Sequence, residues 1–190
     1  MIKNGLVVLL LLFSTICVRA AESRWNYFNN NDEMREETSY FAALRSSNTI
    51  HSKQFGMVYL TIYFMAKPSS KYSNIPNITA FFVLSDGLID CEPAPDHDCS
   101  VSYRVDKKAV DDSLGFVLEG KPDTLYLGHG SLIGHNGNRA FYSAIFLSGL
   151  AWFSQFRMAK QVIVEVPVVG HGLAQFKFHV SDLNLTHGRL

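Results

Sequence analysis

The chain has 190 residues, 17 Lys and Arg against 17 Asp and Glu, and 47% hydrophobic and 13% aromatic residues. This length fits one domain, and a formal net charge of zero excludes the strongly basic surface of a dedicated nucleic-acid binder. The apolar content also excludes an intrinsically disordered chain, because there is enough of it to bury a core.

Residues 1–20 have the features of a secretory signal peptide. Lys3 supplies the N-terminal positive charge, and a continuous apolar run over residues 6–13 follows it. The small residue Ala20 marks the expected cleavage site, and the apolar run is too short to span a bilayer. The alternative is a lipid anchor at Cys17, which is disfavoured because the residue before it is bulky.

Removal of that segment leaves residues 21–190, which we expect to form a single β-rich domain with 15 basic against 17 acidic residues. It also leaves two cysteines, Cys91 and Cys99, in a chain bound for an oxidising compartment. A disulfide between them is the natural expectation. Since no other apolar stretch is long enough to cross a bilayer, we predict a periplasmic or secreted protein without a transmembrane anchor.

The N-terminal residues 22–37 are polar and Asn-rich, and Trp25, Tyr27 and Phe28 stand among them. These three aromatic residues have two interpretations. They either tether the N-terminal segment by packing across the domain, which we favour, or form an exposed anchor for a partner.

Beyond residue 37, alternating and β-branched patterns predict a series of strands. They lie at residues 38–44, 55–65, 79–84, 100–105, 114–119, 142–147, 162–168 and 173–180. Asp86-Gly87 is a turn pair typical of hairpins, and Ser148 is placed to cap a short helix over residues 149–160. The predicted fold is mainly β, an antiparallel sandwich or flattened barrel with one short helix near the C-terminal third.

Several short motifs resemble, in order, a group of small secreted bacterial proteins. The residues that carry the resemblance are Trp25, Asp32-Glu33-Met34, Tyr40-Phe41-Ala42, Leu44, Ser46, Asn48, Cys91, Cys99, Val101, Tyr103-Arg104-Val105-Asp106, Ala159-Lys160, Val162, Val164-Glu165, Phe176, Phe178, Val180 and Leu183. This layout is similar to that of the VasI-type accessory proteins associated with type VI secretion. The resemblance implies a periplasmic β-domain and, more weakly, a secretion-accessory role.

The most unusual stretch is the Gly-rich segment 128–139, which contains His129, His135 and Arg139. Glycines let backbone N–H groups approach an anion, and an arginine supplies a two-pronged donor, so the segment is a candidate binding loop. A surface hairpin without a ligand is the simpler interpretation, because neither a phosphate-loop nor a nucleophile-elbow signature is present. No cofactor is predicted.

A metal site is a weaker hypothesis for the same segment. His129 and His135 are six residues apart, and His171 also lies between glycines, so three imidazoles would meet if the two loops approach each other. With Ser131, this set would suit a metal- or His-dependent hydrolase that acts on envelope material. That alternative requires the Gly-rich segment 128–139 and the turn around His171 to lie close together in space.

Two further positions are candidate binding residues. His97 lies between two aspartates inside the Cys91–Cys99 loop. It is either a binding residue, whose charged form the nearby carboxylates favour, or part of a solvated loop tip. Arg104 and Asp106 are two apart on a predicted strand and are expected to share a face. They form either a cross-strand charge pair or a recognition patch.

The residues assemble no catalytic constellation, which favours a binding protein over an enzyme. We therefore expect a non-enzymatic periplasmic binding or accessory module that contacts an envelope or secreted protein, with a secretion-associated or toxin-neutralising role. The hydrolase is the alternative.

Overall fold

The computed structural model describes residues 24–34, 36–67, 77–93, 98–128 and 139–184, and for residues 139–147 only the backbone. The strands are β1 (Asn26–Asp32), β2 (Glu37–Arg45), β3 (Ile50–Ser52), β4 (Gly56–Val58), β5 (Leu60–Lys67), β6 (Asn77–Leu84), β7 (Cys99–Val105), β8 (Asp111–Leu118), β9 (Lys121–Leu127), β10 (Gln161–Val168) and β11 (Gly172–His179). The helix α1 spans Arg139–Met158. The expected signal peptide lies outside the described residues.

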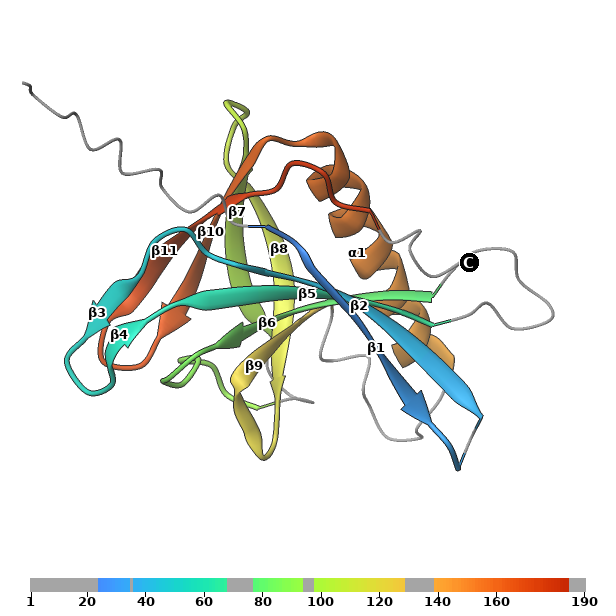
Figure 1. The fold of residues 1–190 in the computed structure, drawn as a ribbon. Helices are drawn as coiled ribbons and strands as arrows, with labels where there is room; N and C mark the ends of the chain where they lie inside the picture. Colours follow the sequence, from blue (N-terminus) through green and yellow to red (C-terminus); the bar gives the residue numbers. More distant parts are fainter. Residues whose placement is uncertain (1–23, 35, 68–76, 94–97, 129–138, 185–190) are drawn as a thin grey trace, which may run out of the picture.

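Nine of the strands form one sheet, in the order β1-β2-β5-β6-β9-β8-β7-β10-β11, and β3 and β4 form a separate hairpin (Figure 1). Every neighbouring pair in the main sheet is antiparallel. The predicted class, mainly β and antiparallel with one helix in the C-terminal third, is therefore confirmed.

The sheet curls so that its two ends approach each other along a line that we call the seam. On one side, Asn48 bonds the backbone of β11 twice: its Nδ2 donates to the Gln175 carbonyl at 2.9 Å, and its Oδ1 accepts the Lys177 N–H at 2.6 Å. Further along, the Trp25 indole donates to the Val180 carbonyl at 3.3 Å. A single curled sheet, whose end strands are bridged by side chains and do not pair with each other, corresponds to the flattened-barrel form of the prediction.

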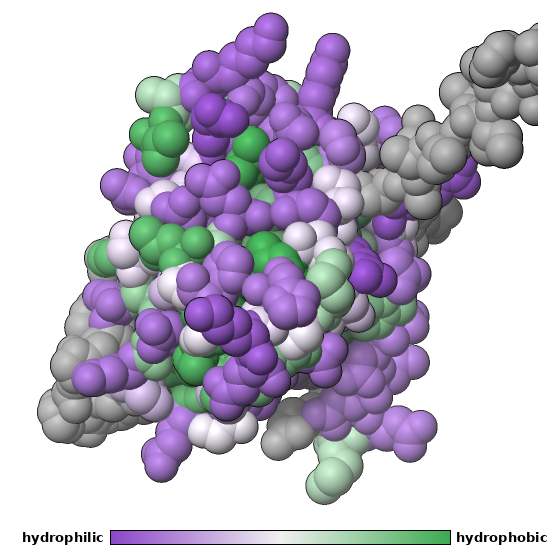
Figure 2. Space-filling view, turned by 90° about the vertical axis from the view of Figure 1, so that its left-hand side faces the viewer, coloured by the Kyte–Doolittle hydropathy of each residue, from purple (hydrophilic) through white to green (hydrophobic). Residues whose placement is uncertain are grey.

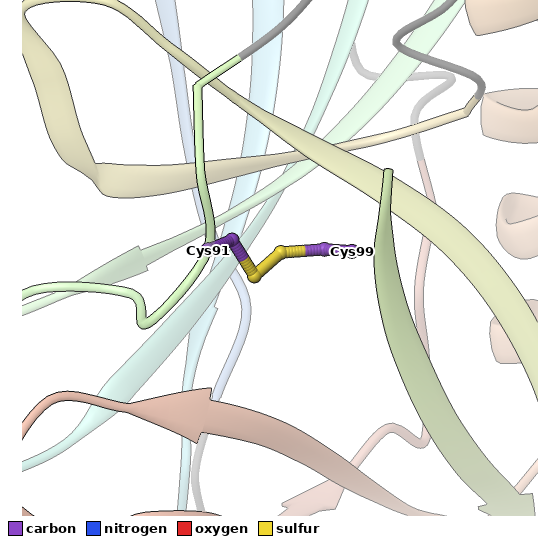
Figure 3. The surroundings of a disulfide bond; sticks show 2 residues. All are labelled: Cys91 and Cys99. Carbon is purple, nitrogen blue, oxygen red and sulfur yellow. A yellow bond between two sulfur atoms is a disulfide. The ribbon is translucent and has the colours of Figure 1, made fainter. Parts of the chain in front are cut away.

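Residues 88–93, which we call the crossing segment, run across one end of this barrel. The Ile89 N–H donates to the Pro122 carbonyl at 2.8 Å, and the Asp90 N–H donates to the Pro167 carbonyl at 3.1 Å. The predicted disulfide is present and joins Cys91 of this segment to Cys99 at the start of β7 (Figure 3). The segment thereby links β9, β10 and β7, which are distant in the sequence.

The inner face of the sheet carries the core. Alternate residues of β5, β6, β10 and β11 are buried on this face, as their period-two patterns predict. Helix α1 packs on the same face and contributes Trp152 and Phe156. The ring centroid of Trp152 lies 5.6 Å from that of Phe82, and the ring centroid of Phe156 lies 6.5 Å from that of Phe178. Trp152 and Phe156 both lie in the segment 149–160 that the sequence predicts as a helix.

Gly149 sets how closely the helix approaches the sheet. A β-carbon at this position would meet the Ile78 carbonyl group and lie 3.0 Å from the Ala80 nitrogen. Only glycine lets the helix backbone lie against β6 at this point.

Aromatic side chains also line the outer face of the sheet, across β5, β6, β9 and β8. Tyr63 stacks on Phe81 at 5.1 Å, and Tyr126 lies 5.5 Å from both Phe81 and Phe116. Cross-strand aromatic pairs of this kind stabilise neighbouring strands beyond the area they bury.

The structure corrects several of the predicted elements. Residues 142–147 are not a strand but belong to α1, so Ser148 lies within the helix and does not cap it. A short apolar run suits either a strand or a buried helix, and this one continues into the amphipathic stretch that follows. The strand expected over residues 55–65 is divided between β4 and β5, with Tyr59 between them.

Three strands were not predicted, and one turn has a different role. β1 forms from the Asn-rich segment and pairs along its whole length with β2, β3 forms over residues 50–52, and β9 forms over residues 121–127. The Asp86-Gly87 turn leads into the crossing segment and not into a hairpin, because β6 pairs with β9. None of the helices in the described residues is long and apolar enough to cross a membrane.

Candidate functional site

The outer face of β7, β10 and β11 brings together polar side chains from three separate parts of the chain. Ile163 in β10 is opposite Arg104 in β7 on one side and Lys177 in β11 on the other. In the next cross-strand row, Glu165 is opposite Ser102 and Gln175. Their neighbours along each strand are buried on the inner face, so these side chains point outward.

These rows border a shallow cavity of about 190 Å³, which we call the outer groove. Its lining residues are Ser102, Tyr103, Arg104, Val110, Ile163, Glu165 and Gln175. Figure 2 shows the side of the molecule on which β3, β4 and β11 lie, where hydrophobic side chains form separate patches among hydrophilic ones. The lining of the groove thus combines the apolar side chains of Ile163 and Val110 with charged and amide groups.

The polar groups of the groove differ in whether they already have a partner. The Glu165 carboxylate accepts a hydrogen bond from Gln175 at 2.9 Å, and the Ser102 hydroxyl donates to Asp112 at 2.7 Å. Arg104 and Lys177 are both exposed, and the described residues offer neither of them an ion-pair partner. The two cations lie on either side of Ile163, about 10 Å apart across two interstrand spacings.

Tyr103 fixes the inner side of this region. The residue is 8% exposed, and its ring lies 4.5 Å from the ring of Trp152 in α1. The hydroxyl donates to the Asp111 carboxylate at 3.0 Å and accepts from the Gln155 amide at 3.3 Å. Burial raises the pKa of the Tyr103 hydroxyl above its usual value of 10.0, so it stays protonated and acts as a structural donor.

Asp106 does not share the outer face with Arg104 as the sequence predicts. β7 ends at Val105, and Asp106 has a left-handed backbone with φ of 51°. Its Oδ1 accepts the N–H groups of Gln161 at 2.9 Å and Lys160 at 3.0 Å. These two bonds hold the pKa of the carboxyl below its usual value of 3.8, and they attach the end of β7 to the start of β10.

The predicted Gly/His site lies largely outside the described residues. This holds for His129 and His135, and also for Ser131 and for His97 in the disulfide loop. Arg139 is the first residue of α1, which fixes its backbone position only.

His171 is exposed in the turn between β10 and β11, with its Nδ1 3.2 Å from the His51 carbonyl oxygen. Within the described residues, no three His, Cys, Asp or Glu side chains come together as a metal site.

Of the predicted binding residues, Arg104 is the one that the described structure places at a groove. Sequence reasoning did not single out Ile163, Glu165 and Lys177, although each alternates with buried residues in its strand. That alternation shows which residues face outward, whereas their meeting depends on the register of three strands.

Comparison of the chain with protein-family models, with curated proteins and with solved structures found no match.

Proposed function

We propose that this chain is a secreted, periplasmic binding module without catalytic activity, and that it recognises another envelope or secreted protein through the outer groove. The observation that carries the proposal is a pair of exposed cations, Arg104 and Lys177, on either side of the apolar side chain of Ile163, neither of which has an ion-pair partner among the described residues. The disulfide between Cys91 and Cys99 supports an oxidising compartment. The secretion-accessory or toxin-neutralising role rests on the resemblance of the sequence motifs.

The groove suits an acidic segment of the partner with an apolar side chain between its carboxylates. A carboxylate binds the planar guanidinium of Arg104 through two parallel hydrogen bonds, and a second one reaches the ammonium of Lys177. The apolar side chain lies on Ile163 and Val110, which removes their surface from water. Glu165 repels a third carboxylate and so fixes the register of the bound segment.

Charge reversal at the groove tests this proposal. The immobilised protein is incubated with an extract of the source cells, the retained protein is identified, and its affinity is measured at two salt concentrations. We expect Arg104→Glu and Lys177→Glu each to weaken binding about tenfold or more, which corresponds to roughly 1.4 kcal/mol. Binding by the original chain should also weaken as salt increases.

Lys53→Glu is the matched control. Lys53 is an exposed cation in the turn between β3 and β4, so its reversal changes the net charge equally and leaves the groove intact. Equal losses of affinity in all three variants, or none in either groove variant, would show that the partner binds elsewhere.

A further inference from the structure

The two edge strands of the main sheet, β11 and β1, differ in how far the rest of the chain covers them. The edge of β11 is covered, because Asn48 and Ser47 bond the backbone of Gln175 and Lys177. At the other end, the described residues place no strand beyond β1. Figure 1 shows β1 at this end, next to β2.

β1 also lacks the features with which proteins protect a free edge strand. Such strands usually carry a lysine, a proline, a bulge or an inward-pointing charge, or they are very short. β1 has seven residues, Asn-Tyr-Phe-Asn-Asn-Asn-Asp, and pairs with β2 in an unbroken register. The backbone edge of β1 is therefore able to accept a further strand, beside the side-chain bonds by which Trp25 and Tyr27 hold residues 180–184.

Phe28 is the second observation at this edge. It lies near the centre of β1 and is 42% exposed, although its ring stacks on Phe41 at 4.9 Å with an angle of 3° between the planes. One face of the ring is covered by Phe41 of β2, while part of the side chain remains in water. An apolar side chain in this position gains from a neighbour on the next strand.

From these observations we infer that β1 pairs with β1 of a second copy of this chain, antiparallel, about a two-fold axis through Asn29. Asn29 is the middle residue of the strand, so this register pairs all seven residues. Phe28 is then opposite Asn30 of the second copy and diagonal to the second Phe28, within reach of an aromatic ring. Two main sheets join into one continuous sheet, and the interface is isologous, as two-fold symmetry requires.

The charges at the ends of β1 fit this arrangement. In the antiparallel register, Asp32 and Glu33 of one copy lie opposite Asn26 and Trp25 of the other, next to its Arg24. Each end of the pair therefore brings an acidic group near a basic one, and no like charges face each other among residues 24–34, the described part of this region. This proposal is independent of the outer groove, which lies on β7, β10 and β11.

Cysteine cross-linking tests both the pairing and its register. In a Cys17→Ser background, Asn29→Cys places two cysteines opposite each other, with Cα atoms about 4.5–5.5 Å apart, inside the range of a disulfide. Asn31→Cys is the matched control, because its two copies would lie four residues apart along the strands, about 14 Å. We expect a covalent dimer on mild oxidation at position 29 and none at position 31.

The second measurement is the mass of the purified protein over a range of concentrations, by analytical ultracentrifugation. We expect a monomer–dimer equilibrium that Asn30→Lys weakens about tenfold or more, because the lysine charges the edge. Leu173→Lys, on the exposed part of β11, should leave the equilibrium unchanged. A monomer at every concentration, or equal cross-linking at positions 29 and 31, would overturn the inference.

Discussion

At the scale of single residues, Asp106 shows how a candidate binding residue serves the fold. Its carboxylate receives two backbone N–H groups where β10 begins, and its left-handed backbone suits an aspartate better than most other residues. Asp106→Asn removes the charge and keeps an acceptor oxygen, so we expect a less stable protein at pH 7. Urea denaturation of both proteins at several pH values measures the difference.

The pH dependence of that difference has a definite sign. Because the folded-state pKa of Asp106 is lower than its unfolded value, the charged form stabilises the fold above about pH 3.8. This contribution is lost as the pH falls through the lower folded value. The stabilities of the two proteins should therefore converge in acid, whereas Asp86→Asn, in an exposed turn, is the control for a general effect of charge. A difference that persists unchanged at pH 2 would contradict the assignment.

The sequence identifies some of the site residues and not others, for a physical reason. Arg104 stands out because it is the charged residue of a strand whose other members are uncharged. Lys177 and Glu165 look like ordinary outward residues of their strands until the register brings them beside Ile163. Local patterns determine which face a side chain occupies, but not which distant strand lies next to it.

At the scale of elements, Gly149 determines the contact between α1 and β6. Alanine favours a helix by about 1 kcal/mol over glycine, so the change would stabilise an isolated helix. Here the added β-carbon meets the backbone of Ile78 and Ala80, which cannot move without disturbing the sheet. We expect Gly149→Ala to lower the free energy of unfolding by about 1–3 kcal/mol in urea denaturation.

Ser154→Ala is the control for this change, since Ser154 is exposed on the same helix. It should leave the stability nearly unchanged or slightly increase it. If Gly149→Ala proved as stable as the original chain, the close approach of helix and sheet would be wrong.

The elements that the sequence predicts best are those whose pattern is set by burial. β10 and β11 alternate regularly because one face of each is in the core. β1 escapes prediction because asparagine is unfavourable in strands, and its conformation comes from pairing with β2. The strand predicted over residues 142–147 is wrong, although these residues are apolar enough for a strand. Their helical conformation depends on the packing of α1 against β6.

At the scale of the whole molecule, the disulfide holds the crossing segment against one end of the barrel. Closing a loop of eight residues' separation stabilises the folded chain by about 2.5 kcal/mol in the chain-entropy description. We expect reductant to lower the urea midpoint of the original protein accordingly. A variant with both Cys91→Ala and Cys99→Ala should unfold at the same midpoint with and without reductant. An original protein that is insensitive to reductant would contradict this prediction.

The seam joins residues that are far apart in the sequence and are therefore synthesised at different times. The partners of Trp25 and Tyr27 are Val180 and Asp182, each 155 residues further along the chain. A ribosome makes the first strand well before the residues that close the barrel over it. The inner face therefore stays open to water, or to a chaperone, until residues 180–182 have been added. A chain truncated before residue 180 lacks the backbone groups that bond Trp25 and Tyr27, so we expect that it cannot close the seam.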